Sequence, residues 1–301
     1  MKVKEELRQF AYDNKMDCFG VMPVDRMKDL PEHYRPTDLY PEGKNVIVMG
    51  MALSEGVIQA HDAAFSGGPD RIQVFTAFGY NKVNELLNIA ALRMVRLIEK
   101  KYGGIALTMP SNEPHNNQQG HRVFLPPASV GRDENEMMGI ISNRRSAVAA
   151  GLAEFGLNGL ALTPQWGPRV RWSVIVTDAE LEADPQYHGP KLCHECMHCA
   201  DVCPTDAFNR DEHREFKIGD KDCRYCKLSR YVCRMAQTGL SKGPSGRLQM
   251  EVSKNDFTVV EDWRKLVRSD DKWDRLERVA AMCGRCMIEC PVGREHTNTG
   301  L

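Results

Sequence analysis

The segment Cys193-His-Glu-Cys-Met-His-Cys-Ala-Asp-Val-Cys203-Pro204 decides the fold of the C-terminal third of the chain. Its spacing is C-x2-C-x2-C-x3-C-P, and most of it recurs as Cys283-Gly-Arg-Cys-Met-Ile-Glu-Cys290-Pro291. Ten of the eleven cysteines lie between these two segments or within them, and Cys18 stands alone. In a chain without an export signal, cysteines this close together are more typical of metal ligands than of disulfides.

The doubled cysteine spacing is that of bacterial ferredoxins, in which three thiolates hold one [4Fe–4S] cluster and the fourth ligates a second cluster. Two-residue gaps let successive thiolates point at different corners of one cluster. By the same logic the last cysteine of the second segment crosses back to the first cluster. The predicted ligands of the first cluster are therefore Cys193, Cys196, Cys199 and Cys290.

The second cluster then has Cys203, Cys283 and Cys286, and its fourth ligand does not follow from the repeat, because the position three before Cys283 is Ala280. The nearby candidates are Cys223, Cys226 and Cys233; we favour Cys223, with Cys226 as the alternative. A zinc ribbon built from the C-x2-C pairs and a single cluster with spare cysteines are the competing interpretations. A doubled C-x2-C-x3-C-P is less expected of zinc.

Composition limits the classes of partner. A chain of 301 residues with 42% hydrophobic and 27% charged residues can form one large or two medium globular domains. The formal net charge of −1 provides no bulk basic field for nucleic acid, which makes that partner unexpected. The N-terminal sequence shows no apolar signal core, and no apolar run approaches the roughly 20 residues that span a bilayer. We therefore expect a cytoplasmic protein with no membrane partner.

The first 187 residues mix helical and strand patterns, which predicts an α/β or α+β domain. Residues 4–14 and 82–101 have helical periodicity, and residues 147–155 have a helical pattern. Strands are expected at 44–51, 105–109, 160–163 and 172–177, with a long loop at 112–136. We place a domain boundary near 187, so that residues 188–301 form a ferredoxin-like domain. No G-x-G-x-x-G motif follows a strand, and no P-loop is present.

Several segments resemble the corrinoid-dependent reductive dehalogenases and the related epoxyqueuosine reductases. The longest is Ser146-Ala-Val-Ala-Ala-Gly-Leu-Ala-Glu-Phe-Gly-Leu-Asn-Gly-Leu-Ala-Leu-Thr-Pro-Gln-Trp-Gly-Pro-Arg-Val-Arg171, followed by Thr177-Asp178 and the first cysteine segment. Upstream, Tyr34-Arg-Pro-Thr-Asp-Leu-Tyr-Pro-Glu-Gly-Lys-Asn-Val-Ile-Val48, Phe78-Gly-Tyr-Asn-Lys82 and Met109-Pro-Ser-Asn-Glu113 are similar to segments of these families. The resemblance covers most of the chain from about residue 34.

This resemblance implies a nitroreductase-like domain that binds cobalamin or another corrinoid, followed by a two-cluster ferredoxin-like domain. The residues that it places at the corrinoid are Tyr80, Ser146, Gly151, Gly156, Asn158 and Gly167. It further implies that an external ferredoxin or flavodoxin supplies low-potential electrons. Tyr102 corresponds to the proton donor of the dehalogenases, and Arg171 or Arg169 to the arginine that supports it. A cation beside a tyrosine stabilises the phenolate that remains after proton transfer.

The predicted function is a corrinoid- and [4Fe–4S]-dependent reductase of a small organic molecule, similar to the reductive dehalogenases. Nothing in the sequence identifies a carbon–halogen bond as the target. The alternatives are an epoxyqueuosine (tRNA) reductase and an iron–sulfur electron-transfer protein without substrate chemistry of its own. A homodimer is compatible with each of these interpretations.

Overall fold

The computed structural model describes residues 3–32, 34–65, 74–111, 141–229, 233 and 283–294. Its helices are α1 (Val3–Asp13), η1 (Val24–Met27), α2 (Pro36–Leu39), α3 (Glu55–Phe65), η3 (Phe75–Asn81), α5 (Lys82–Leu97), η4 (Ile98–Tyr102), α6 (Asn143–Ala149), α7 (His198–Asp201) and α11 (Arg285–Ile288). Its strands are β1 (Cys18–Pro23), β2 (Asn45–Ala52), β3 (Ala106–Thr108), β4 (Glu154–Phe155), β5 (Ala161–Leu162), β6 (Val170–Thr177), β7 (Phe208–Ile218) and β8 (Lys221–Leu228).

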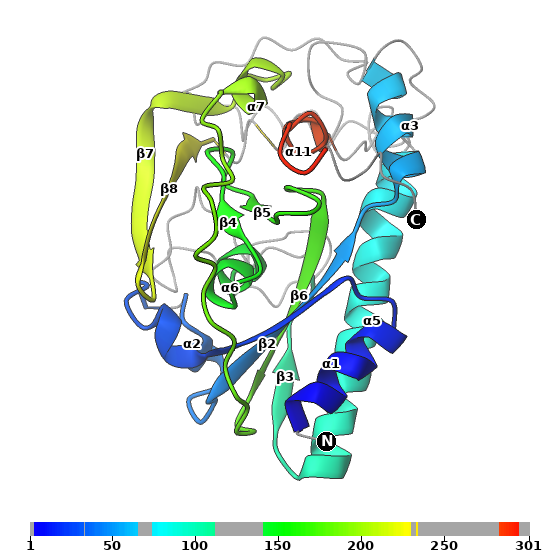
Figure 1. Cartoon of the computed structure of the whole chain (residues 1–301), viewed down its shortest axis with the longest axis vertical. Coiled ribbons are helices and arrows are strands. Elements are labelled where there is room, and N and C mark those ends of the chain that lie inside the picture. Colours follow the sequence, from blue (N-terminus) through cyan, green and yellow to red (C-terminus); the bar gives the residue numbers. More distant parts are fainter. Residues whose placement is uncertain are drawn as a thin grey trace, which may run out of the picture.

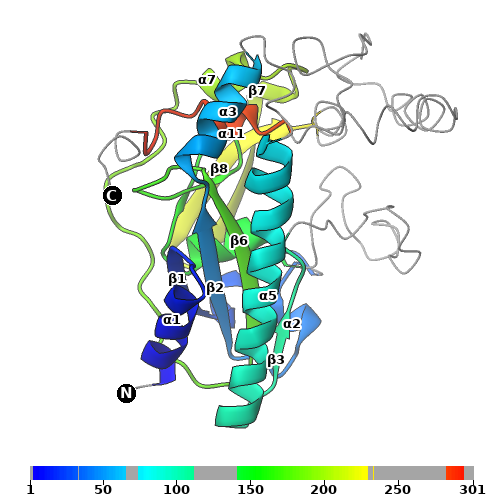
Figure 2. The same cartoon turned by 90° about the vertical axis from the view of Figure 1, so that its right-hand side faces the viewer.

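A four-stranded antiparallel sheet with the order β1-β2-β6-β3 forms the centre of the molecule (Figure 1). Its two central strands are rich in apolar residues and are buried along almost their whole length. Such strands require cover on both faces of a sheet. Helices α1 and α5 cover one face and α6 covers the other (Figures 1 and 2).

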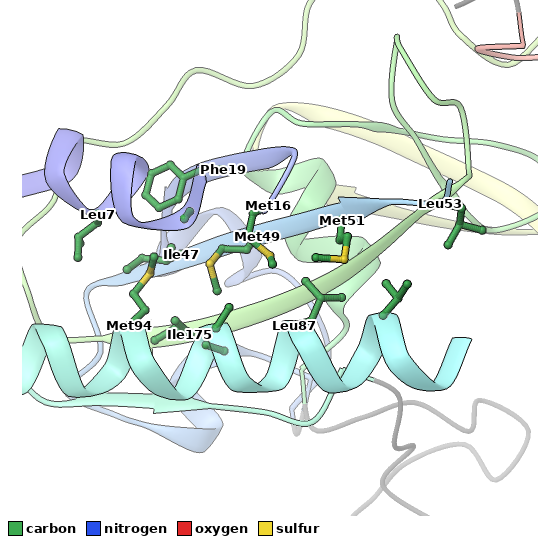
Figure 3. Close-up of a cluster of buried hydrophobic side chains, with 14 of the residues drawn as sticks. Leu7, Met16, Phe19, Ile47, Met49, Met51, Leu53, Leu87, Met94 and Ile175 are labelled. Atoms are coloured by element: carbon green, nitrogen blue, oxygen red, sulfur yellow. The ribbon is translucent and has the colours of Figure 1, made fainter. Parts of the chain in front are cut away.

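The core between α5 and the sheet is built from alternate residues of the central strands. Ile47, Met49 and Met51 of β2 point toward α5, where they meet Leu87 and Met94 (Figure 3). The same core includes residues of α3 and α11, so the second cysteine segment packs against the helices that cover this face of the sheet.

The opposite core joins the two parts of the chain. The residues of α6 pack with Val174 and Val176 of β6, and the same core takes in Ile218 and Tyr225 from the β7–β8 hairpin. The rings of Phe155 and Tyr225 lie 5.5 Å apart between their centroids. The hairpin therefore shares its core with the N-terminal sheet, and the domain boundary near residue 187 stays a prediction.

Most of the predicted elements are confirmed. The expected helices at 4–14 and 82–101 are α1 and α5, the latter prolonged by the π-helical turn η4 and ended by Gly103 at φ 72°. The expected helix at 147–155 is wrong in its bounds, because α6 ends at Ala149 and the chain turns through Gly151 at φ 76°. The predicted loop at 112–136 lies outside the described residues. In the parts of the chain that the structure describes, no helix is long and apolar enough to cross a membrane.

Candidate metal centres and adjoining groove

The two cysteine segments meet at one end of the molecule, where α7 contacts α11 (Figures 1 and 2). Each short helix follows a residue with left-handed backbone, Met197 at φ 57° before α7 and Gly284 at φ 61° before α11. The left-handed residue lies in each case between the two cysteines of a C-x2-C pair. The repeat seen in the sequence is thus a repeat of local backbone geometry.

The thiol of Cys290 lies among the thiols of the first segment, despite its distance in sequence. Burial raises the pKa of Cys199 to about 12, and the next contributions come from the thiols of Cys290, Cys193, Cys226 and Cys196. The pKa of Cys290 is likewise raised by burial and by Cys193 and Cys196, while the Arg169 guanidinium opposes this rise. The four predicted ligands of the first cluster are therefore neighbours in space.

A second group forms around Cys286. Burial raises the pKa of Cys286 well above its ordinary value, and its thiol neighbours in order of effect are Cys233, Cys283, Cys203 and Cys199. The pKa of Cys283 is raised to about 12 by burial, with Cys233 and Cys203 as its thiol neighbours. Cys233 is thus the fourth cysteine of this group.

Our preference for Cys223 as the eighth ligand is not supported. Residues alternate between the two sides of a strand, so Cys223 and Tyr225 of β8 share the side that faces the core around α6. Cys226 lies on the other side of β8, in the cluster that includes Cys193. Burial raises the pKa of Cys226, and Cys193 is the first thiol that adds to this rise. Neither cysteine is placed as Cys233 is, beside Cys283 and Cys286.

The donor set fits iron–sulfur clusters. Cysteines gather around Cys199 and around Cys286, and backbone N–H groups point at cysteine sulfurs, with Leu157 N 3.4 Å from Cys193 Sγ and Ala207 N 3.3 Å from Cys203 Sγ. Hydrogen bonds to cluster sulfurs are one of the means by which a protein sets cluster potential. Among the described residues, no three His, Cys, Asp or Glu side chains converge as they would around a single metal ion.

Arg169 lies next to Cys290 of the first cysteine group, and only 1% of its surface is exposed. Its Nη1 donates to the carbonyl oxygen of Cys290 at 2.8 Å, and its Nη2 donates to that of Val292 at 2.6 Å. Burial lowers the pKa of Arg169 while the Cys290 thiolate raises it, yet an arginine stays charged in proteins. Arg169 therefore clamps the second cysteine segment, and the structure does not place it as a substrate-facing catalytic residue.

Two glycines let this segment approach the turn before β6. Gly167 has φ 54°, and a Cβ built on it would lie 2.0 Å from the carbonyl oxygen of Val292. Gly293 has φ 73°, and a Cβ there would lie 2.3 Å from the backbone nitrogen of Gly167. Only glycine allows both the left-handed backbone and this close approach.

Arg171 lies two residues after Arg169 and faces α5 instead of the cysteines. Its Cζ is 4.1 Å from the centroid of the Tyr80 ring, and its Nε donates to Asn84 Oδ1 at 3.1 Å. Tyr80 belongs to η3, a π-helical segment of the kind that is frequent at functional sites. The structure thus brings together Tyr80 and Arg171, which are both predicted site residues, and adds Asn84.

Asn84 also lines a groove of about 410 Å³ along α5, whose other lining residues among those described are Asn81, Glu85, Asn88, Ile89 and Leu92. Asn84 is 1% exposed, and its Nδ2 has no hydrogen-bond partner. Sequence reasoning missed Asn84, although a signal was present. It lies between Val83 and Leu87 on the buried face of a periodic helix, where an amide is unexpected unless it has a partner.

Tyr102 lies beyond the end of this groove, at the opposite end of the helix from Asn84. It ends η4, about 27 Å along the helix from Asn84 at a rise of 1.5 Å per residue. Its ring packs beside α1, and burial and the Glu6 carboxylate raise its pKa. The structure therefore does not bring Tyr102 to either arginine, which corrects the expected pairing.

The remaining residues that we expected at a corrinoid contact other protein groups. Ser146 is fully buried with its Oγ directed at Met27 Sδ, and Gly151 lies against the carbonyl of Pro185. Gly156 accepts a backbone hydrogen bond from Gly159, and Asn158 Nδ2 donates to the carbonyl of Cys286 at 3.3 Å. Of the six expected residues, Tyr80 is the one that the structure places beside Arg171 and the groove.

Comparison with known proteins supports an iron–sulfur domain. Residues 187–209 match the model of the 4Fe-4S binding domain. A tetrachloroethene reductive dehalogenase of Desulfitobacterium hafniense is 44% identical over 79 residues, which are 26% of this chain and 14% of the relative. Another, of Sulfurospirillum multivorans, is 34% identical over 64 residues, 21% of this chain and 13% of the relative. The aligned segments thus span about a seventh of these relatives.

Solved structures share the fold over nearly the whole chain. The structure of epoxyqueuosine reductase from Streptococcus thermophilus aligns with a TM-score of 0.52 at 16% identity, covering 98% of this chain and 67% of that one. A catabolic reductive dehalogenase in complex with 3-bromo-4-hydroxybenzoic acid aligns with a TM-score of 0.53 at 14% identity, covering 97% of this chain and 37% of that one.

Proposed function

We propose, from the chain's relationship to the reductive dehalogenases and epoxyqueuosine reductases, that it is an iron–sulfur reductase that uses a corrinoid to reduce a small organic molecule. The relationship itself rests on the 44% identical segment, the 4Fe-4S domain match and the shared fold. The corrinoid, the substrate and the nitroreductase-like description of the N-terminal domain belong to the proposal.

The observation that carries the proposal is the placement of two arginines. Arg169 binds the carbonyl of Cys290, and Arg171 binds Asn84 at the groove. The two arginines are two positions apart in one extended segment. Two residues of extended chain span about 7 Å. The residue that binds Asn84 and the residue that binds Cys290 are therefore carried by the same short piece of backbone, which supports a substrate site near the metal-binding end.

The proposed ligands of the first cluster are Cys193, Cys196, Cys199 and Cys290. Those of the second are Cys203, Cys233, Cys283 and Cys286. When bound, the two clusters would carry electrons from an external low-potential donor to a corrinoid, whose cobalt would supply the two-electron chemistry. The protein's own part is to hold, orient and protonate the substrate.

Tyr80 is the proton donor that the geometry favours, in place of Tyr102. Its phenolic hydroxyl can donate a proton, and the guanidinium of Arg171 lies over its ring, 4.1 Å from the ring centroid. Asn84 holds the guanidinium by its Nε and so fixes the plane of Arg171 over the ring.

Anaerobic reconstitution with iron, sulfide and cobalamin tests the proposal. We expect about eight iron atoms per chain, the sum of two [4Fe–4S] clusters, together with retained corrinoid absorbance. Reduced viologen should then be oxidised when 3-bromo-4-hydroxybenzoic acid, the ligand of one structural relative, or another organohalide is added. Eight iron atoms with no corrinoid retention and no substrate-dependent oxidation would instead indicate an electron-transfer protein.

Reduction of epoxyqueuosine in tRNA is the second candidate, because this chain covers 67% of the epoxyqueuosine reductase structure but 37% of the dehalogenase structure. The net charge of −1 does not favour a nucleic-acid substrate. Incubating the reconstituted protein with an epoxyqueuosine-modified tRNA stem loop and measuring queuosine separates the two reductases.

A further inference from the structure

The first and the last cysteine of the second cysteine segment are each held through their backbone carbonyl by a buried side chain. At the last cysteine, Arg169 Nη1 donates to the carbonyl of Cys290. At the first, His61 Nε2 is hydrogen-bonded to the carbonyl of Cys283. Because a carbonyl oxygen can only accept, this contact requires a proton on Nε2 of His61. His61 is 0% exposed, so the bond is shielded from solvent.

The ring of His61 is held in its orientation by its neighbours. His61 belongs to α3, which contacts α11 (Figure 1). The Phe75 ring of η3 meets it edge-on, with 4.6 Å between the two ring centroids and 67° between the two planes. Phe75 also lies against the turn after Cys283, where Gly284 has φ 61° and an added Cβ would be 2.4 Å from Phe75 Cζ. The donor of His61 is therefore fixed with respect to the peptide between Cys283 and Gly284.

A donor at this carbonyl affects the charge balance of a cluster that Cys283 ligates. Reduction of a cluster adds one negative charge, and the N–H of His61 presents the positive end of its dipole to the backbone of this ligand. Hydrogen bonds and burial are two means by which a protein sets the reduction potential of a cluster. In a buried site the electrostatic effect of such a bond is stronger than in water. His61 thus favours the reduced form of the second cluster.

We propose that His61 is a positioning residue of the second cluster, whose Nε2–H fixes the backbone of Cys283 and raises the reduction potential of that cluster. The inference rests on the proposed function, in which the ligands of this cluster are Cys203, Cys233, Cys283 and Cys286. A less negative potential makes the second cluster easier to reduce. Because Cys283 is assigned to the second cluster, the potential of the first cluster should not depend on His61.

A potentiometric titration of the reconstituted protein, followed by EPR, tests the inference and needs neither substrate nor corrinoid. The signal that Cys286→Ala removes identifies the second cluster. In His61→Leu we expect the ratio of reduced to oxidised second cluster at a given potential to fall about tenfold, which is 59 mV for one electron. The first cluster should keep its potential. His61→Gln, whose amide nitrogen can take the place of Nε2, should restore most of the shift.

His188→Leu is the matched control. His188 is an exposed histidine that pairs with Asp220 at 3.6 Å, so its replacement should leave the potentials of both clusters as they are in the parent protein. An equal shift of both clusters in His61→Leu would overturn the inference, because the effect would then be global and not local to Cys283. Unchanged potentials in His61→Leu, at full iron content, would also overturn it and leave the proposed function standing.

If His61→Leu fails to hold the second cluster, His61→Asn takes its place, because the shorter amide cannot reach the carbonyl of Cys283. A lowered potential in this variant would support the inference, and an unchanged one would overturn it. Loss of the second cluster from His61→Gln as well would overturn it, since this variant keeps the donor. If the parent protein binds both clusters but retains no corrinoid, the proposed function fails while the same titration still decides the role of His61.

Discussion

Arg169 Nη1 donates a hydrogen bond of 2.8 Å to the carbonyl oxygen of Cys290, a residue 121 positions later in the chain. With the bond from Nη2 to Val292, this contact fastens the end of the second cysteine segment to the turn before β6. Because Arg169 is almost fully buried and makes no ion pair among the described residues, its charge is compensated by carbonyl dipoles, by Cys290 and by the carboxylates of Glu55 and Asp62.

Arg169→Met should therefore destabilise the protein and weaken the first cluster. Two carbonyls lose their donors, at about 1–3 kcal/mol for each buried group left unsatisfied. Thermal unfolding and iron content measure the effect, and we expect a lower Tm and loss of about half the iron. Lys44→Met removes an exposed ion pair with Glu180 and should change stability by less than about 1 kcal/mol. Full iron and an unchanged Tm in Arg169→Met would contradict the clamp.

Cys233→Ser should reduce the iron content or convert one cluster to an altered form, because it removes a proposed ligand of the second cluster. Cys223→Ser should leave the iron content and the EPR spectrum unchanged, since Cys223 lies in the core around α6. The two variants are matched in chemistry and differ only in position. The opposite result would restore the original preference for Cys223.

Cys290→Ala should damage the cluster held by the first segment, and Cys203→Ala the other cluster. The reason is the crossed arrangement, in which the last thiol of each segment joins the group of the other. EPR spectra of the reduced variants distinguish the two clusters. If Cys290→Ala and Cys203→Ala lose the same signal, the crossed assignment is wrong.

Tyr80→Phe should bind corrinoid and substrate but turn over about 10²- to 10⁴-fold more slowly, the usual contribution of a positioned proton donor. Tyr102→Phe should keep its turnover, because Tyr102 lies about 27 Å along the helix from Asn84. Steady-state assays with reduced viologen compare the two variants. Slow turnover of Tyr102→Phe alone would restore the assignment made from sequence.

Gly167→Ala should destabilise the protein by more than about 1 kcal/mol, since the backbone is left-handed and the new methyl would meet the carbonyl of Val292. Gly56→Ala is the control, because a Cβ in α3 meets nothing within 4 Å and alanine favours a helix. Denaturant unfolding of both variants gives the comparison. Equal free energies of unfolding for the two variants would show that the segments around Gly167 and Val292 can move apart without loss of stability.

The local parts of this protein could be predicted from its sequence. The periodicity of residues 82–101 determines a helix, and the apolar runs at 44–51 and 172–177 determine the central strands. The C-x2-C spacings determine which thiols can share a cluster, because short spacings restrict the directions of neighbouring side chains. The antiparallel hairpin of β7 and β8 was missed, since its strands carry many charged residues on the exposed side.

The partners between distant segments were decided by the tertiary structure alone. Cys223, Cys226 and Cys233 are equivalent as residue types, and only the alternation of β8 and the path of the chain distinguish them. In the same way Tyr80, not Tyr102, lies at Arg171, because the helix that carries both tyrosines spans the length of the sheet. Sequence spacing limits contacts within a few residues, whereas contacts between distant residues depend on how the buried faces of the sheet and helices pack.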